Sequence, residues 1–305
     1  MGKKGILGIT AVTAATLTGY FLQKRLAGRP GRLPLPGATG RRGWALITGA
    51  SSGIGEAFAR RLAGEGYSLL LVARRQNRLE TLAEALRQQQ GVTVEVLAAD
   101  LSQADAVARV ERRIANLDLT ILVNNAGFGS NKPLAESDLD VQVDMLNLHV
   151  QATMRLCRAA LPGLIARGRG AIINVSSIAA FFPSPGDVNY PASKAYMNVF
   201  SQALQAEVFR HGVKVQALCP GFTHTEFHAT PIMTGFQKSR VPAPLWMTAD
   251  QVVAESLRCL GKDQVICVPG KRNQLLVLGA QNGLAGLALR FARRFRHRNG
   301  ATING

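Results

Sequence analysis

The stretch "ALITGASSGIGEAF" (Ala45–Phe58) decides the fold, because it sets a turn rich in glycine and serine between an apolar run and a segment with helical spacing. Gly49, Gly53 and Gly55 let the backbone turn tightly, approach an anion closely and enter a helix that packs against the strand. The first turn of that helix would offer N–H groups to a phosphate. A glycine-rich surface loop is the alternative interpretation, and the rest of the chain has to decide between them.

Apolar runs alternate with helical segments along the chain from Trp44 onward. The apolar runs are "WALIT", "SLLLVA", "VTVEVLAAD", "LTILVNNAG", "GAIINVSS" and "VKVQALCPG". Between them lie segments such as "NRLETLAEALRQQQ", an amphipathic helix ended by Gly91. Continuous apolar strands separated by helices indicate a parallel sheet covered on both faces, with its ligand at the carboxyl ends of the strands. The sequence therefore predicts an α/β, doubly wound, Rossmann-like fold in a single catalytic domain.

The composition suits one enzyme-sized domain with terminal extensions. The chain has 305 residues, of which 47% are hydrophobic and 18% charged. Its four cysteines form no CxxC pair and have no histidines at metal-ligand spacing: Cys157, Cys219, Cys259 and Cys267. We therefore expect neither a disulfide framework nor a metal site, and a reducing cytosol is the simpler setting.

The formal charge of +17 lies mostly at the two ends of the chain. Residues 1–42 hold eight Lys or Arg and no acid, and residues 263–305 hold seven against Asp263 alone, which leaves +3 on the body. A nucleic-acid-binding body would carry basic side chains among aromatic ones, but only 6% of the residues are aromatic. The charge pattern favours a membrane surface and no nucleic-acid partner.

The terminal segments predict three divisions of the chain. Residues 1–42 contain the uncharged stretch Gly5–Leu22, read as a membrane anchor or a cleaved targeting segment, followed by a basic linker. Residues 43–262 are the catalytic domain, and residues 263–305 are a basic amphipathic tail that lies in a membrane interface or packs in a dimer. An uncleaved anchor would hold the catalytic domain at a membrane facing the cytoplasm. Cleavage would leave the protein in the cytoplasm or an organelle.

Four further motifs follow the glycine-rich stretch in a fixed order. They are "AAD" before Leu101, "NNAG" (124–127), "YPASK" (190–194) and "PGFTHT" (220–225). Together with the TGxxxGxG spacing of the opening turn, they resemble the short-chain dehydrogenase/reductase family over roughly residues 44–262. The resemblance implies a dinucleotide site made by Gly49, Ser51, Ser52, Gly53, Ile54, Gly55, Arg74, Asp100, Leu101, Asn125, Ala126, Gly127, Tyr190, Lys194, Pro220, Gly221, Thr223 and Thr225.

The chemistry of carbonyl reduction explains the YxxxK pattern. A proton must reach the carbonyl oxygen as hydride arrives, and a free tyrosine has a pKa of about 10. Lys194 follows Tyr190 by one helical turn, so its ammonium is expected to lower the pKa of the phenol. By the resemblance, Ser177, thirteen positions earlier, holds the substrate oxygen in preference to its neighbour Ser176. Asn147 fixes a proton-relaying water.

Four histidines are expected to be surface or pocket-lining residues and not metal ligands: His149, His211, His224 and His228.

The end of the second apolar run predicts the cofactor. An NAD-dependent enzyme usually has an acid there for the ribose 2′-hydroxyl, but this chain has Ala73, Arg74 and Arg75. A guanidinium suits the 2′-phosphate of NADP(H), and a solvated arginine pair is the alternative. We therefore expect NADP(H).

The expected function is an NADP(H)-dependent oxidoreductase that interconverts a ketone and a secondary alcohol. Apolar side chains gather where the family places its variable lid: Phe227, Ile232, Met233, Phe236, Leu245, Trp246 and Met247. They suit a long-chain acyl, steroid-like or terpenoid substrate. Alternatively, they only pack the lid against the domain. A non-catalytic dinucleotide-binding regulator or redox sensor on the same fold is the alternative. The resemblance also implies a homodimer or homotetramer formed through the helix that carries YxxxK.

Overall fold

The computed structural model describes residues 42–130, 132–183, 186–229 and 238–281. The predictions for Gly5–Leu22, for the linker up to residue 41 and for the arginine-rich residues 282–305 lie outside these ranges. Within the described ranges, no helix is long and apolar enough to cross a bilayer.

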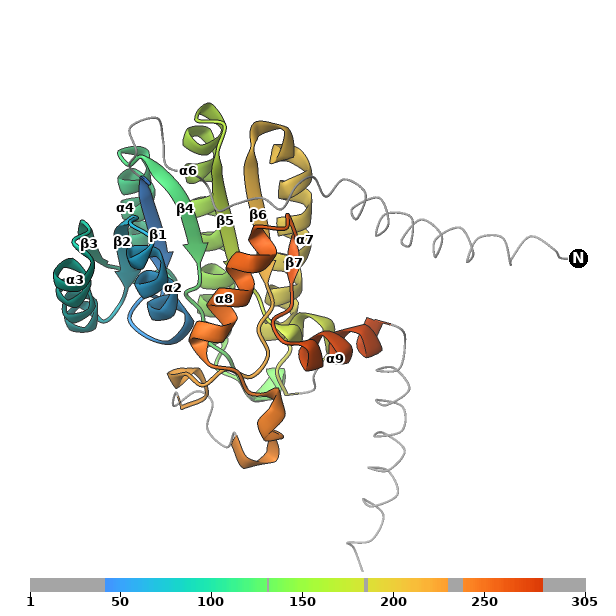
Figure 1. The fold of residues 1–305 in the computed structure, drawn as a ribbon. Coiled ribbons are helices and arrows are strands. Elements are labelled where there is room, and N and C mark those ends of the chain that lie inside the picture. Colours follow the sequence, from blue (N-terminus) through green and yellow to red (C-terminus); the bar gives the residue numbers. More distant parts are fainter. Residues whose placement is uncertain (1–41, 131, 184–185, 230–237, 282–305) are drawn as a thin grey trace, which may run out of the picture.

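A seven-stranded sheet forms the centre of the molecule (Figure 1). Its strands run in the order β3-β2-β1-β4-β5-β6-β7, and all the pairings are parallel. The strand bounds are β1 Trp44–Thr48, β2 Ser68–Ala73, β3 Val94–Ala98, β4 Leu119–Asn124, β5 Gly170–Val175, β6 Val213–Leu218 and β7 Ile266–Cys267. The strand order reverses between β1 and β4, which confirms the doubly wound α/β fold predicted from the alternating runs.

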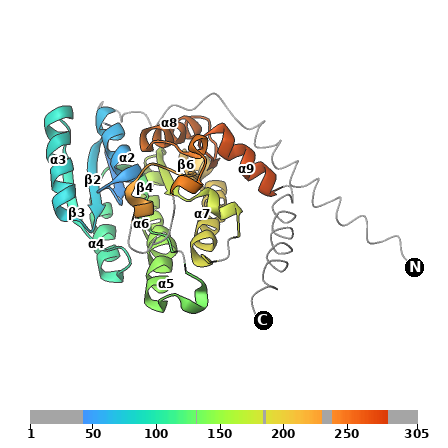
Figure 2. The same ribbon diagram turned by 90° about the horizontal axis from the view of Figure 1, so that it is seen from below.

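Helices cover both faces of the sheet (Figure 2). They are α2 Gly53–Gly64, α3 Gln76–Gln90, α4 Ala104–Ala115, α5 Leu139–Leu146, α6 Thr153–Ala166, α7 Asn189–Val208, α8 Ala249–Leu260 and α9 Lys271–Gln281. In β1, Ala45 and Ile47 pack with α2, α3 and α8, whereas Leu46 points to the opposite face and packs with α4, α6 and α7. The two cores follow from the alternation of side chains along a strand.

The loops at the carboxyl ends of β1, β4, β5 and β6 gather at one edge of the sheet, because the strands are parallel and closely in register. Asn124 in β4 lies beside Asn174 in β5, and Val175 lies beside Leu218 in β6. The glycine-rich turn, "NNAG", Ser177 and "PGFTHT" follow these strands directly. The fold therefore brings three of the predicted motifs and Ser177 to one place.

The folded domain extends beyond the boundary predicted at residue 262. β7 pairs with the end of β6, and α9 packs against the 3₁₀ helices η3 (Ile178–Phe181) and η8 (Ala243–Leu245). The prediction placed residues 263–305 in a basic tail because of their charge, but their first part completes the sheet and supports a site loop. That boundary is therefore corrected to lie at or after Gln281.

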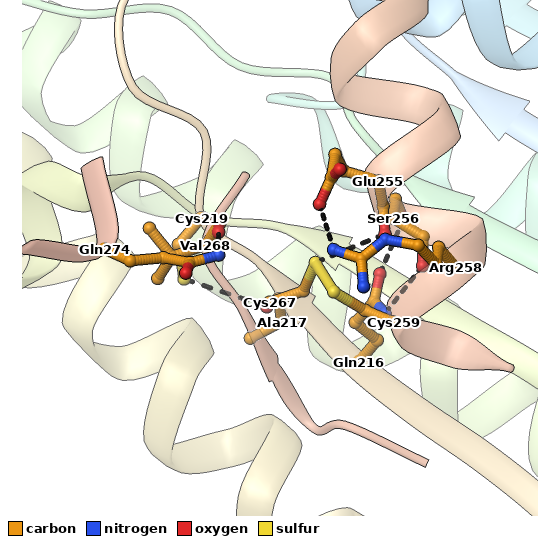
Figure 3. The surroundings of a disulfide bond; sticks show 10 residues. All are labelled: Gln216, Ala217, Cys219, Glu255, Ser256, Arg258, Cys259, Cys267, Val268 and Gln274. Atoms are coloured by element: carbon orange, nitrogen blue, oxygen red, sulfur yellow. Dashed lines mark hydrogen bonds and ion pairs between the residues drawn. A yellow bond between two sulfur atoms is a disulfide. The ribbon is translucent and has the colours of Figure 1, made fainter. Parts of the chain in front are cut away.

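A disulfide joins Cys259 to Cys267 (Figure 3). It links the last turn of α8 to the edge strand β7, with a Cα–Cα distance of 6.0 Å that suits such a bond. The expectation that these cysteines would stay unpaired is wrong, because the chain reverses after α8 and brings together two residues whose spacing in sequence resembles no motif. Cys157 and Cys219 are free and buried.

Candidate active site

The glycine-rich turn has the geometry of an anion cradle. Gly49 and Gly53 have φ values of +65° and +60°, which side chains rarely adopt. A Cβ at Gly49 would lie 2.7 Å from Asn125 Nδ2, and one at Gly55 would collide with the Gly49 carbonyl. Ser52, at the N-cap of α2, makes no side-chain hydrogen bond to the first turn of that helix. The Ser52 side chain therefore does not occupy the N–H groups of this turn, which suits the predicted phosphate site.

Thr48 locks this turn to the "NNAG" segment. Its side-chain oxygen accepts hydrogen bonds from the N–H groups of Asn125 (2.9 Å) and Ala126 (3.0 Å). The Asn125 amide in turn donates to the Thr48 carbonyl at 2.9 Å. The two segments therefore move as one unit. The sequence analysis missed Thr48, although its position between a buried strand and Gly49 was a usable signal.

Arg74 and Arg75 directly follow β2, where the adenosine end of a bound dinucleotide is expected. Arg74 is 71% exposed in its side chain and lies 3.7 Å from the carboxylate of Asp100. Arg75 donates hydrogen bonds to the hydroxyls of Ser51 (3.0 Å) and Ser52 (2.7 Å) in the glycine-rich turn. The prediction named Arg74 for the 2′-phosphate. In the structure, Arg75 and not Arg74 contacts the serines of the glycine-rich turn.

Three further residues predicted for the dinucleotide site, Asp100, Leu101 and Ile54, make contacts within the protein. The Asp100 carboxylate accepts hydrogen bonds from the N–H and hydroxyl of Ser102, which shapes the turn after β3. Leu101 is buried among the side chains of the α4 face. Ile54 is partly buried against the opposite core.

Ser177, Tyr190 and Lys194 meet at the end of β5. Tyr190 and Lys194 are one turn apart in α7, and the Lys194 ammonium lies 5.6 Å from the centre of the Tyr190 ring. Ser177, the N-cap of η3, accepts a hydrogen bond from the Ala179 N–H at 3.1 Å, and hydrogen bonding with its side chain lowers the pKa of Tyr190. The structure thus brings together the three side chains that the sequence selected.

Ser176 has a different role from its neighbour. It is buried, and its hydroxyl donates to the Lys194 carbonyl at 2.8 Å. Its hydroxyl hydrogen is therefore engaged with the backbone of α7, whereas the side chain of Ser177 influences the pKa of Tyr190. This difference supports the choice of Ser177 made from its offset.

The pKa of Tyr190 differs from the prediction. Burial raises it to about 12, the hydrogen bond from Ser177 lowers it, and the nearby Asp187 carboxylate raises it further. The expected lowering of this pKa by Lys194 is not seen, because desolvation dominates at the phenol. At neutral pH the phenol is therefore protonated, which is the form that can donate a proton.

Asp187 is a titratable group that the sequence analysis missed. Burial raises the pKa of Asp187 to about 6, and hydrogen bonding with the backbone of Tyr190 lowers it in part.

Lys194 is buried at the centre of the site, with only 4% of its surface exposed. Its ammonium donates to the Val175 carbonyl at 2.9 Å and lies 3.7 Å from Met197 Sδ. Burial lowers the pKa of Lys194 to about 7. A Cβ at Gly127 would lie 2.7 Å from His149 Nε2, so this position next to the Lys194 ammonium has no room for a side chain.

Asn147 begins a π-helical segment, Asn147–Ala152, between α5 and α6. Among the described residues we find no hydrogen-bond partner for its half-buried side chain. Single π-turns inside helices are frequent at functional sites, because they turn side chains out of the regular helical repeat. The water-fixing role of Asn147 stays a prediction.

His149, in the same π-helical segment, connects three parts of the site. It is fully buried, and its Nε2 accepts a hydrogen bond from the Phe128 N–H at 3.2 Å. Its Nδ1 lies 2.9 Å from the Ser193 hydroxyl, which donates to the Tyr190 carbonyl at 2.8 Å. Nε2 is therefore the unprotonated nitrogen, and Nδ1–H donates to Ser193. Burial, with a smaller effect of Lys194, holds the pKa of His149 well below its usual value.

The sequence analysis treated His149 as a surface or pocket-lining residue, but it is a buried hydrogen-bonding residue. The His224 ring, in contrast, stacks on Trp246 with 4.8 Å between ring centres. Among the described residues, no group of three His, Cys, Asp or Glu side chains is placed to hold a metal ion.

The "PGFTHT" segment closes the site from the β6 side. The Pro220 carbonyl accepts from the Ile178 N–H at 2.9 Å, and the Thr223 hydroxyl donates to the Gly221 carbonyl at 3.0 Å. The methyl group of Thr225 packs on Gly53, where a Cβ would lie 2.9 Å from it. The nicotinamide segment and the phosphate turn are thus in direct contact.

Two aromatic side chains of the lid have separate roles. The Phe227 ring lies 5.8 Å from the Tyr190 ring and faces the catalytic side chains. Trp246 packs on Phe222 and His224 and fastens the lid to the domain. The packing interpretation therefore holds for Trp246, and contact of Phe227 with the substrate stays a prediction. Ile232, Met233 and Phe236 lie outside the described ranges.

Comparison with known proteins assigns the family. The profile described as short chain dehydrogenase matches residues 43–232. The chain belongs to the short-chain dehydrogenase/reductase family. It is an oxidoreductase of the class that acts on CH–OH and C=O groups, as predicted from the motifs.

Two relatives in sequence act on lipid-like molecules according to their names. 17-beta-hydroxysteroid dehydrogenase type 3 of Danio rerio is 38% identical over 234 residues, which cover 74% of this chain and 73% of the relative. Very-long-chain 3-oxoacyl-CoA reductase-A of the same organism is 34% identical over 222 residues, covering 72% and 67%.

A solved short-chain dehydrogenase from Sphingobium yanoikuyae in complex with NADPH superposes with a TM-score of 0.71. It is 33% identical, and the match covers 86% of this chain and 96% of that one.

Proposed function

We propose that this short-chain dehydrogenase/reductase uses NADP(H) to interconvert a ketone and a secondary alcohol on an apolar, lipid-like substrate. The observation that carries the proposal is the convergence of Ser177, Tyr190 and Lys194 after the end of β5, with the Lys194 ammonium 5.6 Å from the centre of the Tyr190 ring. A binding protein or redox sensor has no need of a proton donor at this position.

Each side chain has a defined part in the reaction. NADPH would supply the hydride when bound. Ser177 holds the carbonyl oxygen by a hydrogen bond beside the phenol, and Tyr190 donates its proton to that oxygen as negative charge develops. The pKa of Lys194 is about 7, and its ammonium form then stabilises the negative charge of the Tyr190 phenolate. His149 and Ser193 hold the first turn of α7, and hence Tyr190, against the "NNAG" segment.

The preference for NADP(H) is proposed from the strand end after β2. Arg74 and Arg75 stand where an acid would select NAD, and the Ser51 and Ser52 hydroxyls lie beside Arg75. Two guanidinium groups and two hydroxyls are donors that suit a phosphate. The complex of the Sphingobium dehydrogenase with NADPH supports the same cofactor in a related structure.

The substrate class is proposed from the lid and from the relatives. Phe227 presents an apolar face to Tyr190, which suits a substrate with an apolar group next to its carbonyl. The names of the two Danio rerio relatives refer to a hydroxysteroid and to a very-long-chain acyl-CoA thioester. We therefore propose a steroid or long-chain acyl carbonyl compound.

We also propose a homodimer or homotetramer in which α5 and α7 lie at the interface. The exposed apolar side chains of these helices support it, with Leu139 at 72% and Val199 at 66% exposure. Association at a membrane is a separate proposal that depends on residues outside the described ranges.

The Tyr190→Phe variant tests the enzyme proposal. It removes the phenol oxygen but keeps the ring contacts with His149 and Phe227, so the fold and cofactor binding should be preserved. Loss of one positioned acid costs about 10²–10⁴-fold in rate, and kcat should fall by that factor on steroid and 3-oxoacyl thioester ketones.

Tyr196→Phe is the matched control, because Tyr196 is in the same helix and stacks on Phe200 away from the site. It should retain wild-type kcat. A Tyr190→Phe enzyme with more than a tenth of the wild-type kcat would show that Tyr190 is not the proton donor.

A further inference from the structure

Glu226 joins the start of the lid to the cofactor end of the fold. It is the first residue of the 3₁₀ helix η5 (Glu226–Ala229), directly after "PGFTHT". Its carboxylate accepts a hydrogen bond from Arg75 at 2.8 Å and another from Arg78 at 2.6 Å. Both arginines belong to the start of α3, about 150 positions away in sequence. This contact could not be foreseen from any local pattern.

The same Arg75 guanidinium is bound to the glycine-rich turn. Its Nη2 donates to Ser51 at 3.0 Å and to Ser52 at 2.7 Å, and its Nη1 donates to Glu226. A carboxylate therefore sits on the arginine that flanks the phosphate turn. The side chains of Arg75 and Glu226 are 42% and 50% exposed, so a ligand in solution can reach both.

We propose that Glu226 competes with the 2′-phosphate of NADP(H) for Arg75 and so determines the cofactor preference of this enzyme. The inference rests on the proposed NADP(H) site. A phosphate monoester carries about −1.5 to −2 charges at neutral pH, and it repels a carboxylate that shares the same guanidinium. The stronger anion takes the Arg75 donors, and Glu226 keeps its pair with Arg78.

This competition has a structural consequence for the lid. Without the 2′-phosphate, Glu226 ties the first turn of the lid to both Arg75 and the serines that Arg75 holds. With the 2′-phosphate bound, only the ion pair between Glu226 and Arg78 still holds the first turn of the lid. Glu226 thus links occupancy of the phosphate site to the segment that carries Phe227, which faces Tyr190.

Calorimetric titration of the full chain with NADP⁺ and with NAD⁺ tests the inference without any catalytic readout. Glu226→Gln should bind NADP⁺ about three- to tenfold more tightly than the wild type, the range expected when exposed ion pairs and a like-charge contact are removed. The Kd for NAD⁺ should change less than about twofold, because NAD⁺ has no 2′-phosphate.

Two further variants sharpen the result. Glu84→Gln makes the same charge change at an exposed ion pair within α3, and it should alter neither Kd. In an Arg75→Met background, Glu226→Gln should tighten NADP⁺ binding less than in the wild type, because the competition for the shared donor is gone and only the like-charge contact is relieved.

The outcomes separate the two proposals. Wild-type protein that prefers NADP⁺ while Glu226→Gln binds it equally or more weakly refutes the inference and leaves the proposed function intact. Equal tightening of NADP⁺ and NAD⁺ by Glu226→Gln also refutes it. Wild-type protein that binds NAD⁺ at least as tightly as NADP⁺ refutes the cofactor proposal and the inference together.

Discussion

Replacement of His149 by phenylalanine is expected to destabilise the fold and to remove part of its sensitivity to acid. The imidazole accepts from the Phe128 N–H and donates to Ser193 inside a fully buried site. A phenyl ring fills a similar volume but leaves both partners without their hydrogen bond. Each buried group left unsatisfied costs about 1–3 kcal/mol, so the free energy of unfolding should fall by about 2–5 kcal/mol at pH 7.5.

The pH dependence follows from the direction of the His149 pKa shift. Burial keeps the folded-state pKa well below the value of about 6.5 expected when unfolded. Below that pH, the unfolded chain takes up a proton that the folded protein does not, and stability is lost as the pH falls. One such group removes about 1.4 kcal/mol between pH 7.5 and pH 5.5.

Asp187 acts in the opposite direction over the same range. Its pKa is raised to about 6 in the folded protein, so protonation of Asp187 favours the folded state as the pH falls. The change in the free energy of unfolding of the wild type with pH therefore contains both contributions and does not isolate that of His149. The comparison of the wild type with the variant does, because Asp187 is present in both.

Urea unfolding at pH 7.5 and pH 5.5 measures the difference. The wild type should lose about 1.4 kcal/mol more than His149→Phe between these values. His149→Gln serves if the phenylalanine variant does not fold, because its amide keeps one of the two hydrogen bonds and also lacks the titration. His211→Phe removes an exposed histidine and should keep the wild-type acid sensitivity. An identical pH dependence in the wild type and both His149 variants would refute the assigned neutral state of His149.

Two further predictions concern the cofactor and the terminal segment. Wild-type kcat/KM should be about tenfold higher with NADPH than with NADH, because one charge-assisted contact to the 2′-phosphate supplies at least that factor. Arg74→Asp should reverse this preference. Equal kcat/KM values for the two cofactors in the wild type would contradict the prediction. If residues 5–22 anchor the protein, the full chain should stay with membranes in high salt, whereas residues 43–305 should be released because only basic contacts of about 1 kcal/mol each hold them. Full-length protein that is soluble in low salt with Met1 retained would argue against the anchor, and a mature N-terminus near residue 23 would indicate cleavage.

The strand-end motifs were predictable because a parallel sheet converts sequence order into spatial proximity. Gly49, Asn125, Ser177 and Gly221 each follow an apolar run, and the carboxyl ends of parallel strands lie at one edge. Tyr190 and Lys194 were predictable for a different reason, since four positions on a helix put two side chains on one face. Both arguments need local spacing and the fold class alone.

Contacts between distant segments were not predictable in this way. His149 lies in a π-helical turn, and the sequence "NLHVQA" does not indicate that its third residue points inward. The expected effect of Lys194 on the Tyr190 pKa was wrong for a related reason. Spacing gives proximity of two charges, whereas burial, which dominates this pKa, depends on the complete fold.

The part of the chain after the family match shows how far the site depends on such distant contacts. Asn273, in α9, is buried, and its amide donates to the Pro269 carbonyl at 2.9 Å. A Cβ at Gly221 would lie 2.6 Å from that amide, so the "PG" turn fits only because residue 221 is glycine. α9 is held next to this turn by β7, and β7 is joined to α8 by the Cys259–Cys267 disulfide. The first part of the segment predicted as a basic amphipathic tail therefore packs against the turn that is expected to contact the nicotinamide, because Asn273 fills the space beside Gly221.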